Sequence, residues 1–189
     1  MANAQKNIFM AFLSGTIGRQ MTLSQKAGST IAGKKRGPSL IPATEDQLDV
    51  QSRFRIASKY ALAAILDPVT KAAYAAVARK GQSAYNVALA DAFTPPEIIS
   101  INTAGFHGLL GDSITIRAVD YFKVVSVRVR IHDSAGVLAE DSNAVLQSNG
   151  LDWVYRTTSV IGNPIGTKIT VTATDLPANE TVKELVIPA

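Results

Sequence analysis

The stretch DSITIRAVDYFKVVSVRVRIHDSAG, residues 112–136, contains two runs in which apolar and polar residues alternate. Alternation with a period of two places every second side chain on the same face of a β-strand. Residues 112–119 and 123–132 are therefore predicted strands, separated by a turn. We expect the apolar face of each strand to line a hydrophobic core. The residues expected on these inner faces are Ile114, Ile116, Ala118, Val125, Val127, Val129 and Ile131.

Short alternating runs continue through the rest of residues 97–189, with turn residues between them. About seven or eight short strands in fewer than a hundred residues are typical of a β-sandwich. The further predicted strands are 97–102, 136–140, 144–148, 151–158, 167–174 and 182–187. Their expected inner residues are Leu151, Trp153 and Tyr155 on one face, and Ile169, Val171 and Ala173 on another.

Polar positions on these strands and loops offer two places for binding. Arg117, Arg128 and Arg130 alternate with the inner residues and so point outward. They could form a binding patch, but a charged solvent face that discourages edge pairing is the interpretation we favour. An adhesive or carbohydrate-binding module would instead use the loops between strands, at Gly105–Gly111 and Ser148–Gly150.

A group of helix signals precedes the strands. Thr44 and Gln47 fit the capping box that starts a helix. Asp67-Pro68 ends this helix and begins a second, and Ser83 can cap a third. Paired prolines at 95–96 then end the helical region. The apolar residues expected to face inward are Val50, Phe54, Ala57, Ala61 and Ile65 on the first helix, and Val69, Ala73, Ala76 and Val77 on the second.

The N-terminal segment is strongly basic. Residues 1–43 contain six basic and no acidic residues, whereas residues 94–189 contain seven basic and ten acidic residues. The segment between them, 44–93, contains six basic and five acidic residues. This asymmetry suggests a basic arm joined to a mildly acidic body. The arm residues that we expect to contact a partner are Arg19, Lys26, Lys34, Lys35 and Arg36.

The arm also carries strand-like patterns. Alternation over 16–24 predicts a strand, Lys26-Ala27-Gly28 a turn, and Ser29–Ala32 a returning strand. The apolar run IFMAFL at 8–13 is too short to span a bilayer, which needs about 18 residues. It predicts a strand or packing segment, although a signal-peptide core without a clean cleavage site is an alternative. An isolated hairpin is marginal in water, so the arm must pack on the helices or on another copy.

The stretch GSTIAGKK, residues 28–35, is close to the phosphate-binding loop of nucleotide hydrolases. That loop needs a hydroxyl residue after the lysine and a helix beginning there. Here Lys35 occupies the hydroxyl position and Gly37-Pro38 opposes a helix, so we expect a basic loop with two turn glycines. The two histidines, His107 and His132, have no nucleophile or metal-ligand pattern around them, and there is no cysteine. We therefore expect no catalytic residue, no metal and no cofactor.

The stretches DSITIRAVDYFKVVSVRVRIHDSAG and ITVTATDLPANET (169–181) resemble bacterial immunoglobulin-like domains. The whole arrangement also resembles bacterial proteins in which a GTIG-type hairpin, here Gly15–Gly18, and helices precede such a domain. The resemblance implies a fold for the C-terminal half, and it implies no activity.

These patterns together predict an α+β multidomain protein. We expect a basic hairpin arm at 1–43, a helical domain at 44–94 and an immunoglobulin-like β-sandwich at 95–189. The predicted function is that of a non-enzymatic structural protein that self-assembles through its arm, as in a virion, filament or surface layer. Its expected partners are other copies of itself or an acidic protein surface, with no membrane span. The alternatives are a nucleic-acid-binding protein that uses the arm, and an adhesive module that uses the sandwich loops.

Overall fold

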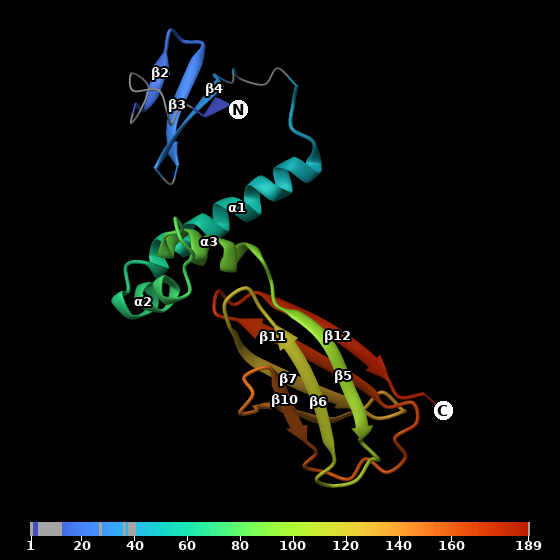
Figure 1. Cartoon of the computed structure of the whole chain (residues 1–189). Helices are drawn as coiled ribbons and strands as arrows, with labels where there is room; N and C mark the ends of the chain where they lie inside the picture. Colours follow the sequence, from blue (N-terminus) through green and yellow to red (C-terminus); the bar gives the residue numbers. More distant parts are fainter. Residues whose placement is uncertain (1, 4–12, 27, 36, 38–40, 189) are drawn as a thin grey trace. The chain divides into compact units, whose positions relative to one another are not determined.

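The computed structural model describes residues 2–3, 13–26, 28–35, 37 and 41–188. Within these residues the protein is an α+β fold with three helices and three antiparallel sheets (Figure 1). The chain divides into two compact units. One contains Met1–Gln51 with Arg79–Gln82, and the other contains Ser52–Ala78 with Ser83–Ala189.

The first unit contains a four-stranded sheet, which we call the arm sheet. Its strands are β1 (Ala2–Asn3), β2 (Gly15–Ile17), β3 (Met21–Lys26) and β4 (Ser29–Lys34), in the order β1-β4-β3-β2. The returning strand predicted at 29–32 is confirmed and extends to Lys34. Most of the apolar run at 8–13 lies outside the described residues.

The prediction of one strand over 16–24 is wrong, because a turn at Gly18–Gln20 divides it into β2 and β3. Gly18 and Arg19 both have a φ of 57°, and the Gln20 N–H donates to the Ile17 carbonyl at 3.2 Å. Positive φ at successive residues gives the backbone twist that suits a tight hairpin. The alternation continues across the turn by chance, so the pattern alone could not reveal the reversal.

The helices start where the capping signals predict. They are α1 (Glu45–Ala64), α2 (Pro68–Ala76) and α3 (Ala84–Phe93). Thr44 and Gln47 exchange the two hydrogen bonds of a capping box, at 3.2 and 3.3 Å. The Asp67 carboxylate accepts from the first N–H groups of α2, and the Ser83 hydroxyl accepts from the Asn86 N–H of α3.

The inner side of α2 differs from the prediction. Tyr74 is fully buried, whereas Val69 is 77% exposed and Val77 is 53% exposed. The predicted stripe of small apolar residues is therefore wrong, because the large ring of Tyr74 fills the space among the helices and fixes which side of α2 faces inward. The predicted inner residues Ala57 and Ala61 of α1 are buried. Val50 and Phe54 of α1 are about half exposed, against the prediction.

The C-terminal region consists of two four-stranded antiparallel sheets, which we call the two-sheet body (Figure 1). Their orders are β5-β6-β10-β9 and β12-β11-β7-β8. The strands are β5 (Glu97–Gly105), β6 (Ser113–Val119), β7 (Val124–His132), β8 (Leu138–Asn143), β9 (Val145–Leu146), β10 (Asp152–Arg156), β11 (Lys168–Asp175) and β12 (Glu180–Val186).

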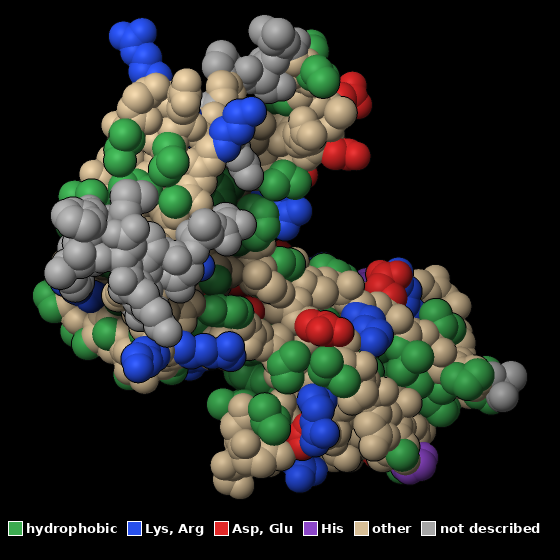
Figure 2. Space-filling model, turned by 45° about the horizontal axis from the view of Figure 1, so that its top comes forward, with side chains coloured by type: hydrophobic (Ala, Val, Ile, Leu, Met, Phe, Trp, Pro, Cys, Tyr) green, Lys and Arg blue, Asp and Glu red, His purple; other side chains and the backbone are tan. Residues whose placement is uncertain are grey.

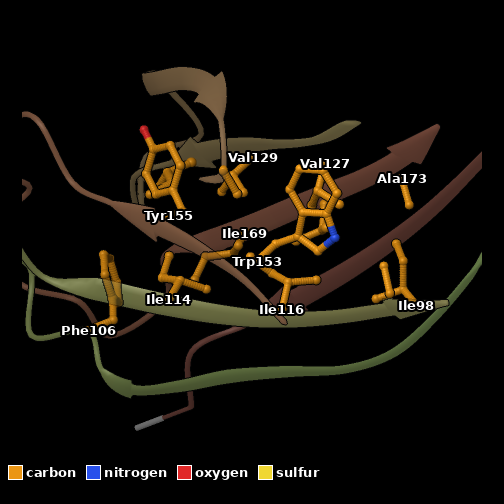
Figure 3. Packing of buried hydrophobic residues seen from close by; sticks show 14 residues of the cluster. Ile98, Phe106, Ile114, Ile116, Val127, Val129, Trp153, Tyr155, Ile169 and Ala173 are labelled. Atoms are coloured by element: carbon orange, nitrogen blue, oxygen red, sulfur yellow. The ribbon is translucent and has the colours of Figure 1, made fainter. Parts of the chain in front are cut away.

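The two sheets share one hydrophobic core. Figure 3 shows Ile114 and Ile116 of β6 in the same cluster as Val127 and Val129 of β7 and Ile169 of β11. Burial of such side chains contributes about 1.5–3 kcal/mol each, so this cluster is the main source of stability in the unit. The predicted inner residues that are buried here are Ile114, Ile116, Ala118, Val127, Val129, Ile131, Trp153, Tyr155, Ile169, Val171 and Ala173.

The prediction is wrong for two residues, Val125 and Leu151, which were expected to face the core but are exposed. Val125 is 47% exposed, because the pairing between β7 and β11 skips it: Thr174 is opposite Ser126, and Asp175 is opposite Val124. This irregularity reverses the alternation, so that Val124 packs against the core instead. Leu151 is 48% exposed, because it lies before β10, in the turn that leads into the strand.

Candidate functional site

The arm sheet carries a groove of about 740 Å³. It lies where the β2–β3 turn meets the C-terminal end of β4. Met21 is paired with Lys34, and the Lys35 N–H donates to the Gln20 carbonyl at 2.8 Å, so the backbone holds the two sides together. The lining residues are Arg19, Gln20, Met21, Ala32, Gly33, Lys34 and Lys35.

Three of these lining side chains are cationic and one is a long apolar side chain. Arg19 belongs to the tight turn, and Lys34 and Lys35 lie at the end of β4. Within the described residues, the salt bridges all lie in the two-sheet body, so none neutralises these three cations. Met21, 39% exposed, adds an apolar and flexible surface beside them. The groove therefore suits an anionic ligand that also presents an apolar group.

The structure brings together three of the five residues predicted to contact a partner. Arg19, Lys34 and Lys35 line the groove. Lys26 lies at the opposite end of β3, paired with Ser29. Arg36 lies outside the described residues.

Sequence reasoning missed that Gln20 and Met21 also line this groove. The signal that could have found Met21 is the predicted turn at Lys26–Gly28, because the register counted back from that hairpin places Met21 opposite Lys34 in the next strand.

The stretch at residues 28–35 is mostly extended strand. Gly28 has a φ of 81° in the turn, whereas Gly33 lies within β4. The expectation of a basic loop with two turn glycines is thus wrong for Gly33. A phosphate-binding loop wraps its N–H groups around a ligand at a helix N-terminus, but here the N–H and carbonyl groups of Ser29–Lys34 face neighbouring strands.

The outward arginines of the two-sheet body are largely paired with carboxylates. Arg117 forms two hydrogen bonds with Asp152, at 2.7 and 2.9 Å, and Arg128 forms two with Asp141, at 2.5 and 2.7 Å. Each guanidinium holds the pKa of its carboxylate partner below the usual range. Arg130 is half-buried, and its Nε has no hydrogen-bond partner within the described residues. This pairing favours a charged strand face over an anion-binding patch.

In each of the two loops predicted for an adhesive site, polar side chains accept hydrogen bonds from backbone N–H groups of the same loop. Asp112 accepts from the N–H groups of His107 and Leu109 at 2.6 and 2.8 Å, and these bonds lower its pKa. Asn149 accepts from the N–H groups of Leu151 and Asp152, both at 3.0 Å. The polar groups of these loops are therefore used mainly to fix the loops.

Among the described residues, no group of three or more His, Cys, Asp or Glu side chains could hold a metal ion. In the same residues, every helix is too short or too polar to cross a bilayer.

No family model matches the chain, and no curated protein matches it. A solved structure of an engineered protein is similar over 68% of this chain, with 16% sequence identity and a TM-score of 0.35. This chain covers 34% of that structure's length.

Proposed function

We propose that the two-sheet body is an immunoglobulin-like sandwich. The strand order supports this, because the eight strands taken in sequence as A, B, C, C′, D, E, F and G give sheets A-B-E-D and G-F-C-C′. Those are the two sheets of the immunoglobulin arrangement. The chain departs from antibody domains in having no cysteine and in carrying its tryptophan, Trp153, on β10.

For the whole chain we propose a non-enzymatic structural role, in which copies assemble through the arm sheet. The observation that carries this proposal is the groove, in which Arg19, Lys34 and Lys35 lie together without carboxylate partners among the described residues. Apolar side chains beside these cations are also exposed, notably Ile17 and Met21. Cations next to exposed apolar groups are typical of a surface that a partner covers.

The partner that this surface fits best is an acidic segment of a second copy. Residues 94–189 contain ten acidic and seven basic residues, so the two-sheet body has the charge opposite to that of the arm. On the face of the molecule in Figure 2, Asp and Glu side chains are open to solvent as well as Lys and Arg side chains. Complementary charge would guide association, and buried apolar groups would hold it.

Charge-neutral variants of the full chain test this role. Replacing Arg19, Lys34 and Lys35 by Gln removes the groove's charge, whereas Lys26→Gln removes a charge from the other end of the same strand. By light scattering, the unmodified chain should form a multi-copy species. The triple variant should be monomeric, whereas Lys26→Gln should form the same multi-copy species as the unmodified chain. An unchanged mass in the triple variant would contradict assembly through the groove.

Nucleic-acid binding is the second candidate, because the same three cations could neutralise phosphates. The groove lining contains no aromatic residue on which bases could stack. Fluorescence anisotropy with a labelled oligonucleotide distinguishes the two roles. A binding constant that falls steeply with salt, and falls further in the triple variant, would favour nucleic acid.

A further inference from the structure

A buried chain of hydrogen bonds joins the three helices within the second unit. Asp91 of α3 is fully buried, and its Oδ2 accepts a hydrogen bond from the Tyr74 hydroxyl of α2 at 2.6 Å. The Tyr74 hydroxyl in turn lies 3.0 Å from the Tyr60 hydroxyl of α1. Burial raises the pKa of both tyrosines, and for Tyr74 the contacts with Asp91 and Tyr60 raise it further. The tyrosines are therefore neutral donors throughout the physiological range.

Asp120, which follows β6 in the two-sheet body, is a second carboxylate near Asp91. Asp120 Oδ2 accepts from the N–H groups of Phe122 and Lys123, at 3.4 and 3.0 Å. Asp120 Oδ1 is buried and has no donor among the described residues, and the same is true of Asp91 Oδ1. The Asp91 and Asp120 side chains are neighbours, and Asp120 is among the groups that raise the pKa of Asp91.

Two neighbouring carboxylates whose buried oxygens lack donors cannot satisfy each other without a proton, because each oxygen is only an acceptor when ionised. An unsatisfied buried acceptor costs about 1–3 kcal/mol, and more if it is charged. One shared proton converts two unsatisfied acceptors into one hydrogen bond and removes one negative charge. Paired carboxylates generally hold a proton in this way.

We propose that Asp91 and Asp120 share one proton, and that this proton makes the junction between α3 and the two-sheet body a pH-sensitive latch. The latch is closed while the carboxyl pair holds the proton. When the proton leaves to water as the pH rises, two negative charges face each other in a buried site, and the junction loosens. This inference does not depend on the proposed function of the arm.

The surroundings of the pair strengthen this assignment. The groups that act on Asp91 are Tyr74, Asp120 and Asp175, of which two are acids. Asp175, at the end of β11, is itself held by two bonds from Asn179 at 2.6 and 2.7 Å. Burial, with the two neighbouring acids, raises the pKa of Asp91 to about 7. The proton would therefore be lost close to neutral pH.

Other contacts cross the same junction and limit how far it can open. The Tyr74 and Phe122 rings have centroids 4.5 Å apart. The Asn179 amide donates to the Ala92 carbonyl at 3.3 Å, and the Thr181 hydroxyl donates to the Pro96 carbonyl at 2.5 Å. Loss of the proton should therefore increase local opening of α3 without detaching the helices from the two-sheet body.

The test uses Asp91→Asn in the full chain, with hydrogen exchange of the α3 amides measured by mass spectrometry. The Asn amide can donate to Asp120 while its carbonyl still accepts from Tyr74, so the variant replaces the proton permanently. A raised folded pKa means that protection is greatest at low pH and is lost as pH rises through that pKa. After correction for intrinsic exchange rates, the wild-type opening constant should rise by roughly tenfold per pH unit between about 5 and 7, the slope for one proton.

In Asp91→Asn the opening constant of α3 should be independent of pH over this range. In Asp120→Asn the new amide can donate to Asp91, so this variant should also show an opening constant independent of pH. It serves as the test if Asp91→Asn does not fold. Asp133→Asn, a matched change in the β7–β8 turn, should keep the wild-type slope, and amides of β7 and β11 should not respond. A flat wild-type profile, or a wild-type slope in both junction variants, would overturn the latch.

Discussion

Glu140 offers a sharp test of how the two-sheet body is held together. This β8 carboxylate is 5% exposed, and its Oε1 accepts from the N–H groups of Thr158 and Ser159 and from the Ser159 hydroxyl, at 2.9, 2.7 and 2.7 Å. Its Oε2 accepts from the Tyr155 hydroxyl. These bonds fasten the segment after β10 to β8, and they lower the pKa of Glu140 against the opposing effect of its burial.

Replacing Glu140 by Gln keeps the shape but removes the charge that strengthens these bonds. A hydrogen bond to a charged group contributes about 1 kcal/mol more than a neutral one. For the three bonds at Oε1 we therefore expect a loss of about 3 kcal/mol in the free energy of unfolding. Because the folded pKa is lowered, the stabilisation is present above the unfolded pKa of Glu and is lost as the pH falls through the folded value.

The assay is urea unfolding at pH 7, followed by tryptophan fluorescence. Trp153, the one tryptophan in the sequence, lies in the core of the two-sheet body and so reports on that unit. The matched control is Glu184→Gln on β12, where the carboxylate forms an exposed salt bridge with Lys168 at 2.7 Å. Exposed pairs contribute about 0–1 kcal/mol. Equal losses in the two variants would show that the buried carboxylate contributes no more than the exposed one, against this prediction.

Further changes test particular parts of the fold. Val127→Thr buries a hydroxyl in the core and should cost about 1–3 kcal/mol by the same fluorescence assay, whereas Val125→Thr should be nearly neutral. Gly108→Ala should destabilise more than Gly111→Ala: both glycines have positive φ, but only at Gly108 would a Cβ meet a carbonyl oxygen, at 2.1 Å. Thr44→Ala should cost about 1 kcal/mol in α1, seen as faster amide exchange in its first turn; an unchanged rate would contradict the capping role.

Sequence patterns predicted correctly those features that depend on residues close together in the chain. The alternation around Ile116 identified the inner face of β6, because a strand with only one face toward the core alternates in burial. The Thr44 capping box fixed the start of α1 for the same reason: both partners lie within one turn. These signals need no knowledge of distant residues.

The errors arose where a distant partner decides the outcome. Val125 is exposed because of the way β7 pairs with β11, which its own sequence cannot reveal. Tyr74 faces inward because α1 and α3 provide hydrogen-bond partners at Tyr60 and Asp91. The groove likewise depends on Lys34 being paired with Met21 across the arm sheet, so charge counting found its cations but not its shape.

In the proposed role, identical copies assemble through the basic groove of the arm sheet. Light scattering tests this by measuring the average mass of the unmodified chain over a range of protein concentrations, at low and high salt. We expect multi-copy species that grow with concentration and become smaller as salt screens the groove's charges. A monomer of 20.0 kDa at every concentration and at both salt levels would contradict the claim.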